Sequence, residues 1–511
     1  MAHEKLSMLL ETYSDNPGAL HKIEEYIATK LPKYIQSFID REKRRETLEF
    51  HMEKYINIFL SDPNTQFYYI PVSNTFIHYN SEHYKLITED NIWHIILSDI
   101  SSKQILMDWK YKVKTKIIKH IKERNIIHSI PESNTIQFIL KFLTPMFFRT
   151  KEESKYFLTC LGDNIFKKIS SSITLKGPLI HIFQSYSKPF ISYIQDISYF
   201  LFQQAINPTL SFRYYLPPLT DYNHCRLIHF NSALAQLQLW KSFIKCNLLD
   251  IIAVSSHYSK RFSNSDSFIM FHSHNKDLRA YTLYMEGKND ENIINDFMKS
   301  CLIEDTKQNI GDKKMLFLWK DYLFTHSFPH FLDDQSLLTI LHSKLTYNQN
   351  EKTFSNLFSP YLCYVHSFMQ FWKDHIYINP ESDFELGELC TMYNNTNVTM
   401  NIDETKMHSL IKHFYPHFMI QGEKYILNIG SDLWDKEKEI RQFLEYLKIY
   451  YEATVEDALS FYKVYILYCN YAKDVHFKYI PSKKYFEKII QKIIPSEFLS
   501  EISILKEYWD D

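Results

Sequence analysis

The sequence predicts a mainly α-helical, multi-domain protein with a small antiparallel β-meander near residues 66–87 and a winged-helix-like α+β module near 375–430. Apolar residues recur every three or four positions through most of the chain, which is the spacing of helices that pack on one face. The two modules instead combine short β-prone runs with turn residues. With 511 residues, 45% of them hydrophobic, the chain is long enough to fold into several domains.

The pattern predicts five regions. They are residues 1–62 (N-terminal helices), 63–170 (β-meander plus basic helical domain), 171–370 (helical middle domain), 371–435 (winged-helix-like domain) and 436–511 (C-terminal helical region). Within the first region, helical spacing before and after the Pro17-Gly18 break, followed by a charged helix over about 40–60, predicts three helices. We expect these helices to pack on one another.

The predicted meander rests on three short runs rich in aromatic and β-branched residues. The runs are 66–72 (QFYYIPV), 74–79 (NTFIHY) and 84–87 (YKLI). Turn-forming residues separate them at 73–74 and 80–81, as in hairpins with short loops. Thr88 then precedes two acidic residues, which predicts a capped helix over 91–100.

The next predicted helix, over 109–124, is the best candidate for contact with nucleic acid. Seven of its residues are basic and one, Glu123, is acidic, while an apolar residue recurs every fourth position from Trp109 to Ile121. We predict that one face contacts phosphate groups through Lys112, Lys116, Lys119 and Lys122. The alternative is a solvated basic face in a protein whose charges balance, with 58 Lys and Arg against 60 Asp and Glu.

The middle of the chain is predicted to be helical with few interruptions. Helices are expected over 129–143, 156–168, 232–258 and most of 281–350, including a nearly all-round buried element over 315–324. The Gly162-Asp163-Asn164 sequence predicts a kink or a loop, and the polar tract 259–267 predicts a loop. The run 225–230 (CRLIHF) is compatible with a single strand.

The C-terminal third has the clearest predicted topology. A helix over 384–393, an acid-capped helix over 403–414 and a hairpin over 417–420 and 425–429 follow one another, which is the order of a winged helix. Its second helix would enter a major groove and carries Lys406 and Lys412, offset by two acids at its start. A winged helix that binds protein is the alternative interpretation.

Several classes of function are excluded or disfavoured. The eight glycines are too dispersed to write a G-x-x-x-x-G-K or a G-x-G-x-x-G motif, which excludes nucleotide hydrolysis on a P-loop. No H-E-x-x-H, G-x-S-x-G or H-x-E…P-C-x-x-C motif is present. The seven scattered cysteines form no C-x-x-C pair, which favours a reducing cytosol and disfavours a zinc ribbon or a disulfide framework.

We therefore predict no enzyme activity, no catalytic residue, no cofactor and no metal. The closest histidine clusters are His272 and His274 with Asp277, and His408, His413 and His417, and neither has the residues or the regular spacing of a metal site. No stretch reaches about 18 uncharged apolar residues, so no membrane insertion is expected.

Residues 68–96 (YYIPVSNTFIHYNSEHYKLITEDNIWHII) resemble the helical linker domain that precedes the ATPase in poxvirus-type primase-helicases of large nucleocytoplasmic DNA viruses. The blocks SIPESNTIQFILKFL, YFLTCLGDN, LLDIIAVSSHYSKRF, MLFLWKDYL and DFELGELC…KYILNIGSDLWDK are similar to those of an uncharacterised conserved protein family of giant viruses that infect amoebae and algae. The second resemblance covers most of 65–440. It implies a viral protein that acts in the host cytoplasm or the viral factory. The ATPase motifs are absent, so helicase activity is not implied.

Together these observations lead us to expect a non-enzymatic viral adaptor that binds DNA or RNA, or nucleoprotein partners, in replication. One alternative is a helical scaffold of a viral translation-initiation complex, which would bind an RNA helicase and a cap-binding protein. A virion structural protein is a further alternative. The expected nucleic-acid-binding residues are Lys112, Lys116, Lys119, Lys122, Lys406 and Lys412.

Overall fold

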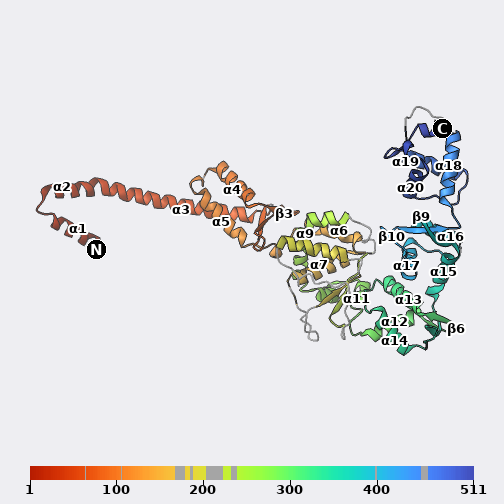
Figure 1. The fold of residues 1–511 in the computed structure, drawn as a ribbon. Helices are drawn as coiled ribbons and strands as arrows, with labels where there is room; N and C mark the ends of the chain where they lie inside the picture. The colour runs from red at the N-terminus through yellow and green to blue at the C-terminus, as the bar shows by residue number, and fades with distance from the viewer. Residues whose placement is uncertain are drawn as a thin grey trace. The chain divides into compact units, whose positions relative to one another are not determined.

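The computed structural model describes residues 1–63, 65–104, 106–166, 168, 179–184, 188–202, 222–231, 239–396, 400–450 and 458–510. It confirms the predicted fold class, because helices dominate and the strands form small sheets of two or three (Figure 1). The chain divides into two compact units. The first comprises Met1–Asp290 and His326–Leu332, and the second comprises Glu291–Thr325 and Asp333–Asp511. The division into five regions stays a prediction.

The N-terminal helices of the first unit do not form the expected three-helix core. They are α1 (Ala2–Thr12), α2 (Pro17–Glu25) and α3 (Leu31–Ser61). The π-helical turn η1 (Tyr26–Lys30) joins α2 directly to α3 without a chain reversal, so these two helices cannot pack on each other. Among the described side chains, buried hydrophobic residues begin only at Met52 in α3. Upstream, Tyr34 and Phe38 are 61% and 51% exposed.

The predicted β-meander is confirmed. Its antiparallel strands are β1 (Gln66–Ile70), β2 (Thr75–Tyr79) and β3 (Tyr84–Ile87), in that order. Both turns contain a residue with positive φ, Asn74 at 51° and Ser81 at 68°, which these small polar residues tolerate. Tyr68 and Ile77 pack into a large core, and Phe67 and Phe76, from the other face, pack into a smaller one. Both faces of this small sheet are therefore covered.

The smaller core joins the meander to α3 and two further helices. They are α4 (Glu89–Lys103) and α5 (Lys110–Lys122), preceded by the 3₁₀ turn η2 (Met107–Trp109). The Thr88 hydroxyl accepts a hydrogen bond from the Asn91 amide at 3.2 Å, which confirms the predicted cap. This core positions α5.

The larger core is built mainly from helices. They are α6 (Ser133–Met146), α7 (Lys151–Ile165), α8 (Lys188–Phe202), α9 (Leu239–Arg261) and α11 (Lys276–Thr282). Two expectations were wrong here. Gly162 lies inside α7, where it lets α9 approach closely, and the predicted loop at 259–267 is instead the end of α9 followed by the short helix α10 (Ser265–Ser267). The carboxylate of Asp163 accepts hydrogen bonds from Ser259 and Ser265 at 2.6 Å each, which explains why this polar segment is ordered.

A short parallel pair of strands carries a buried ionic group. The strands are β4 (Ile180–Ile182) and β5 (Cys225–Leu227). Arg226 is 2% exposed and donates to both carboxylate oxygens of Asp266 at 2.8 and 2.9 Å. His181, on the partner strand, is 3% exposed. Its burial lowers the pKa of the imidazole to about 4, with Asp266 opposing and Arg226 reinforcing the shift.

We expect His181 to make the first unit less stable in acid. The unfolded chain has a histidine pKa near 6.5, so between about pH 6.5 and 4 it binds a proton that the folded chain excludes. The free energy of unfolding should therefore fall as the pH drops through this window. Hydrogen exchange of the amides of the first unit, corrected for intrinsic exchange and compared between the wild type and His181→Gln at several pH values, measures the contribution. Parallel pH dependences of the two proteins would contradict it.

The start of the second unit differs from the expected run of helices over 281–350. The chain forms α12 (Asp290–Cys301), β6 (Ile303–Gly311), α13 (Asp312–Thr325), α14 (Asp334–Lys344) and β7 (Tyr347–Asn348). Strand β8 (Thr353–Phe358) pairs with β6 and β7 on either side. β6 is mostly polar and exposed, so its conformation depends on pairing with a distant strand and not on a hydrophobic period. The prediction that 315–324 is largely buried is confirmed by α13.

The winged-helix-like module is confirmed. Its elements are α15 (Cys363–His375), β9 (Ile376–Glu385), α16 (Leu386–Thr396), α17 (Glu404–Phe414), β10 (Ile420–Gln421) and β11 (Tyr425–Ser431). The structure adds a helix, α15, and a strand, β9, before the two predicted helices. The sheet order is β10-β11-β9, and all pairs are antiparallel. Phe384 lies in β9 and not in the first predicted helix, and of the expected run 417–420 only Ile420 belongs to a strand.

The C-terminal part of the second unit is a helical cluster with a two-stranded sheet. It contains α18 (Lys436–Tyr450), β12 (Ala458–Ser460), α19 (Phe461–Asp474), α20 (Lys483–Ile493) and β13 (Ser503–Leu505). A core of its own includes Phe443, Tyr468 and Phe486. Across the described residues of both units, no helix is long and apolar enough to cross a membrane.

Candidate nucleic-acid interface

Helix α5 has one buried face and one exposed basic face, as predicted. Val113, Ile117 and Ile121 are each 0% exposed and pack in the smaller core of the first unit. Trp109, the first member of the predicted apolar stripe, lies in the preceding 3₁₀ turn and is only partly buried. Because this stripe faces the core, the side chains on the opposite side of the helix face solvent.

Lys112, Lys116 and Lys119 lie on that opposite side, spaced four and three residues apart. The Lys112 ammonium lies 3.6 Å from a Glu49 carboxylate oxygen in α3 and 3.9 Å from the centre of the Trp109 ring. For Lys116 and Lys119, no carboxylate oxygen in the described part of the chain lies within ion-pair distance of 4.0 Å. The two lysines are thus available to an external anion.

Lys122 is placed differently from the other three predicted contacts. Its ammonium is 3.7 Å from a Glu89 carboxylate oxygen and lies 5.5 Å from the centre of the Tyr69 ring, at the edge of the β-meander. A nucleic acid would have to compete with Glu89 for this lysine. Glu49 competes for Lys112 in the same way, so pairing does not separate these two lysines. Lys112, Lys116 and Lys119 are called the basic face because they share the side of α5 opposite its buried stripe, and Lys122 lies beside it.

Aromatic rings alternate with the lysines at the start of α5, a feature that was not predicted from the sequence. Tyr111 is 65% exposed, and its ring centre is 5.3 Å from the Lys110 ammonium and 5.9 Å from that of Lys114. The Lys114 ammonium also lies 3.2 Å from the centre of the Trp93 ring in α4. The signal was the position of Tyr111 between two lysines, but aromatic residues are so frequent in this chain that it did not stand out.

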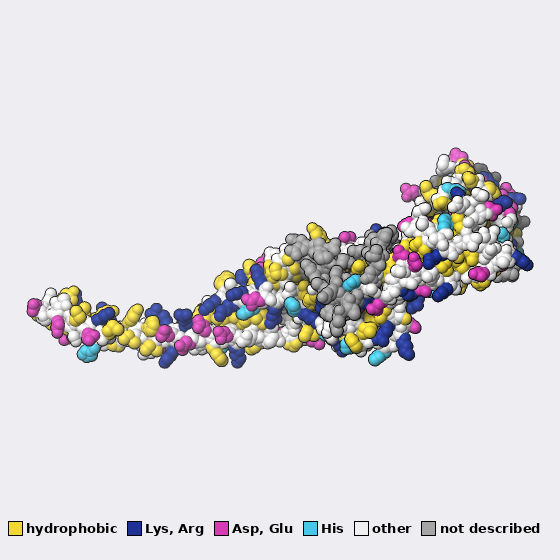
Figure 2. Space-filling view, turned by 90° about the horizontal axis from the view of Figure 1, so that it is seen from below, with side chains coloured by type: hydrophobic (Ala, Val, Ile, Leu, Met, Phe, Trp, Pro, Cys, Tyr) yellow, Lys and Arg dark blue, Asp and Glu magenta, His cyan; other side chains and the backbone are white. Residues whose placement is uncertain are grey.

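The surroundings of α5 are mixed in charge. Arg44 of α3 pairs with Asp108 at 3.4 Å, and Arg45 pairs with Glu49 at 3.5 Å. Figure 2, which shows one face of the molecule, has Lys and Arg side chains interspersed with acidic ones along the N-terminal helices. The basic face is therefore a local patch, and its attraction for phosphate is short-ranged at physiological salt.

In the winged-helix-like module, helix α17 corresponds to the second of the two predicted helices and directly precedes the hairpin, as predicted. The Asp403 carboxylate accepts a hydrogen bond from the Lys406 amide at 2.7 Å and caps the helix. Three residues, 422–424, connect the paired Gln421 and Tyr425 in a tight hairpin, and the first two, Gly422 and Glu423, have φ of 58° and 56°. Lys412 is exposed in the last turn of α17.

Lys406 and the flank of α17 beside it face other parts of the second unit. The Lys406 ammonium lies 4.9 Å from the centre of the Tyr364 ring, and its charge opposes the rise in the pKa of Asp321 that burial causes. Further along the helix, the His413 Nε2 is 2.8 Å from the Lys313 carbonyl oxygen of α13. Both predicted contacts in this helix, Lys406 and Lys412, are exposed, and Lys406 also lies over the Tyr364 ring.

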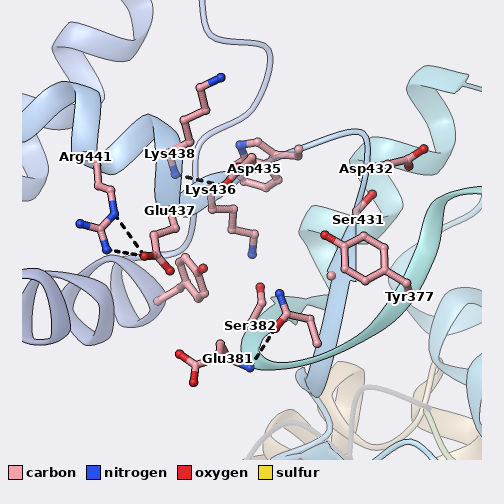
Figure 3. Close-up of a pocket in the computed structure, with 14 residues that line it drawn as sticks. Tyr377, Glu381, Ser382, Ser431, Asp432, Asp435, Lys436, Glu437, Lys438 and Arg441 are labelled. Atoms are coloured by element: carbon pink, nitrogen blue, oxygen red, sulfur yellow. Dashed lines mark hydrogen bonds and ion pairs between the residues drawn. The ribbon is translucent and has the colours of Figure 1, made fainter.

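A cavity of about 590 Å³ lies between the winged-helix-like module and the C-terminal helices of the same unit. Residues of β9, the end of β11, the start of α18 and Tyr485 line it. Figure 3 shows the Lys436 side chain reaching from the start of α18 toward Ser382. The Lys436 ammonium donates to the Glu388 carboxylate at 2.5 Å and to the Asp383 carbonyl at 2.9 Å. It therefore joins α18 to the winged-helix-like module.

The structure brings the predicted residues together as two separate sets. Lys112, Lys116 and Lys119 share one face of the first unit, whereas Lys406 and Lys412 belong to α17 of the second. Among the described residues, no group of three or more His, Cys, Asp or Glu side chains is arranged to hold a metal ion. In comparisons with known proteins, no protein-family model matches the chain, and no curated protein matches it.

Proposed function

We propose that this chain is a non-enzymatic adaptor that binds nucleic acid through the basic face of α5 and joins it to protein partners, in a viral replication setting. The observation that carries the proposal is that exposed Lys119 and half-buried Lys116 lie on the same side of α5 as exposed Lys112, with no carboxylate of the described residues in ion-pair contact with Lys116 or Lys119. In a protein with nearly equal numbers of acids and bases, such a row of lysines is unusual enough to suggest a phosphate-binding role.

Charge reversal of the basic face tests the proposal. We expect Lys112→Glu, Lys116→Glu and Lys119→Glu, combined in the full-length protein, to weaken binding of labelled DNA or RNA strongly. The plot of log K against log salt should become shallower by about 2 to 3, because each phosphate contact contributes roughly 0.7 to 0.9 to this slope. Fluorescence anisotropy at several salt concentrations measures both quantities.

A matched control separates this local effect from the change in net charge. Lys22, Lys30 and Lys33 are exposed lysines of α2, η1 and α3, so their reversal changes the net charge equally without altering α5. We expect this control to bind nearly as the wild type. If the two triple variants behave alike, or if the α5 variant retains affinity and salt slope, the basic face is not the binding site.

The second candidate function is a helical protein scaffold, such as one that assembles translation-initiation factors. It is favoured by the contacts of Lys406 with Tyr364 and of His413 with α13, because these side chains already serve packing within the unit. Affinity purification of the tagged protein from its native cells, with and without nuclease, discriminates the two. Partners lost with nuclease support the adaptor, and a nuclease-resistant complex with translation factors supports the scaffold.

A further inference from the structure

We infer that the ligand of the α5 face is a single-stranded nucleic acid whose bases stack on Tyr111 while its phosphates contact the neighbouring lysines. This inference rests on the proposed function and adds the class of nucleic acid to it. Tyr111 is 65% exposed, the most of any aromatic residue in α5 and the 3₁₀ turn before it. It directly precedes Lys112 in the sequence. A base could therefore stack on the Tyr111 ring while the adjacent phosphate contacts Lys112.

Lysine ammonium groups lie over the faces of the aromatic rings at the start of α5. Two amines, those of Lys110 and Lys114, lie within 6 Å of the Tyr111 ring centre, at 5.3 and 5.9 Å. The Lys112 ammonium lies 3.9 Å from the Trp109 ring centre. Such cation–π contacts at an exposed site are worth about 0.5–1 kcal/mol, so an incoming base can replace them and free the lysine for the phosphate.

The arrangement suits a single strand better than a duplex. In a duplex the bases are stacked inside the helix, and an exposed tyrosine ring gains nothing from them. In a single strand every base offers a face, and proteins that bind single strands combine aromatic platforms with a basic track along the backbone. Lys112, Lys116 and Lys119 provide such a track along α5, and Tyr111 lies at its N-terminal end.

Fluorescence anisotropy of the full-length protein tests the inference with labelled oligothymidine, oligouridine and a DNA duplex of equal length. We expect either single strand to bind more tightly than the duplex. Tyr111→Ala should weaken single-strand binding by about 5- to 150-fold, which corresponds to one lost stack of about 1–3 kcal/mol. The salt slope should stay unchanged, because no phosphate contact is removed.

Two further variants keep the experiment decisive. Tyr111→Phe keeps the ring and should bind as the wild type, whereas Tyr34→Ala removes a tyrosine of α3 that is similarly exposed, at 61%, and should have no effect. A preference for thymidine or uridine would identify DNA or RNA as the source of the strand. Equal affinity for duplex and single strand, or an unaltered affinity of Tyr111→Ala, overturns the inference alone. Absence of binding to all three probes overturns the proposed function as well.

Discussion

Replacing Glu388 with alanine is expected to lower the stability of the second unit by about 3–5 kcal/mol, the usual effect of leaving a buried charge without its partner. Glu388 lies in α16, and its carboxylate accepts hydrogen bonds from the Lys436 ammonium at 2.5 Å, the Ser482 amide at 2.6 Å and the Glu385 amide at 2.9 Å. One side chain therefore connects the winged-helix-like module to the starts of α18 and α20.

The effect should be large because Lys436 cannot reach water easily. Its side chain is 1% exposed, and its ammonium lies 3.6 Å from the centre of the Phe384 ring and 4.4 Å from that of Tyr485. Burial lowers the pKa of Lys436 to about 8, although Glu388 opposes the shift. Without Glu388 the pKa falls further, so the folded variant releases this proton at a lower pH than the folded wild type. The stability difference should therefore shrink as the pH rises toward about 8.

Hydrogen exchange of the amides in α16 and α18 is the appropriate measurement, because a chain of several domains does not unfold in one step. The double variant Glu388→Gln with Lys436→Met removes both charges and should regain much of the protection. Glu487→Ala breaks an exposed pair with Lys483 in α20 and should cost at most about 1 kcal/mol. If Glu388→Ala loses no more protection than this control, the buried pair does not hold the elements together.

The features that were predictable from the sequence are those with a local cause. The β-meander follows from alternating aromatic residues and from Asn74 and Ser81 at its turns, and the structure reproduces all three strands. Likewise Thr88 and Asp403 cap helices that begin at the next residue. Side chains that bond to their own neighbouring backbone determine these boundaries, so no knowledge of the tertiary structure was needed.

Strand β9 shows what local reasoning missed. Pro380 lies within it, and a proline argues against a strand at its position because it cannot donate a hydrogen bond to a neighbouring strand. β9 is an edge strand of its sheet, and its pairing with β11 shifts between Ile378 and Asp383, so Pro380 falls in the unpaired interval. The strand forms because β11, some fifty residues later, provides a partner. Such pairing leaves no periodic signal in the sequence of β9.

The candidate interface was also predictable only where its cause is local. The four-residue repeat from Val113 to Ile121 determined which side of α5 is buried, and hence that Lys112, Lys116 and Lys119 are not. The difference between Lys116 and Lys122 was not predictable, because Glu89 reaches Lys122 from another helix. The accessibility of the lysines thus depends on tertiary neighbours that the helical spacing does not specify.

Gly162→Ala is expected to destabilise the first unit by about 1–3 kcal/mol, although the same change in an unhindered helix stabilises by up to about 1 kcal/mol. A Cβ atom at position 162 would lie 2.2 Å from the Ser255 carbonyl oxygen and 2.6 Å from the Ser259 Cβ of α9. The first of these atoms is backbone, so no change of rotamer relieves the clash. The α7 and α9 helices would have to move apart and lose packing along their contact.

The sign of the change makes this a strict test of the close approach between α7 and α9. Gly18→Ala is the matched control, because Gly18 also lies in a helix, and its Cβ would make only an ordinary contact, 3.6 Å from Asn16. Hydrogen exchange in α7 and α9 should become faster in Gly162→Ala and stay unchanged in Gly18→Ala. Slower exchange in Gly162→Ala would mean that helix propensity outweighs the contact, and the two helices would then be farther apart than the structure places them. Because the chain has only eight glycines, a helical glycine at a crossing is best explained by the space that its missing Cβ leaves for Ser255 and Ser259.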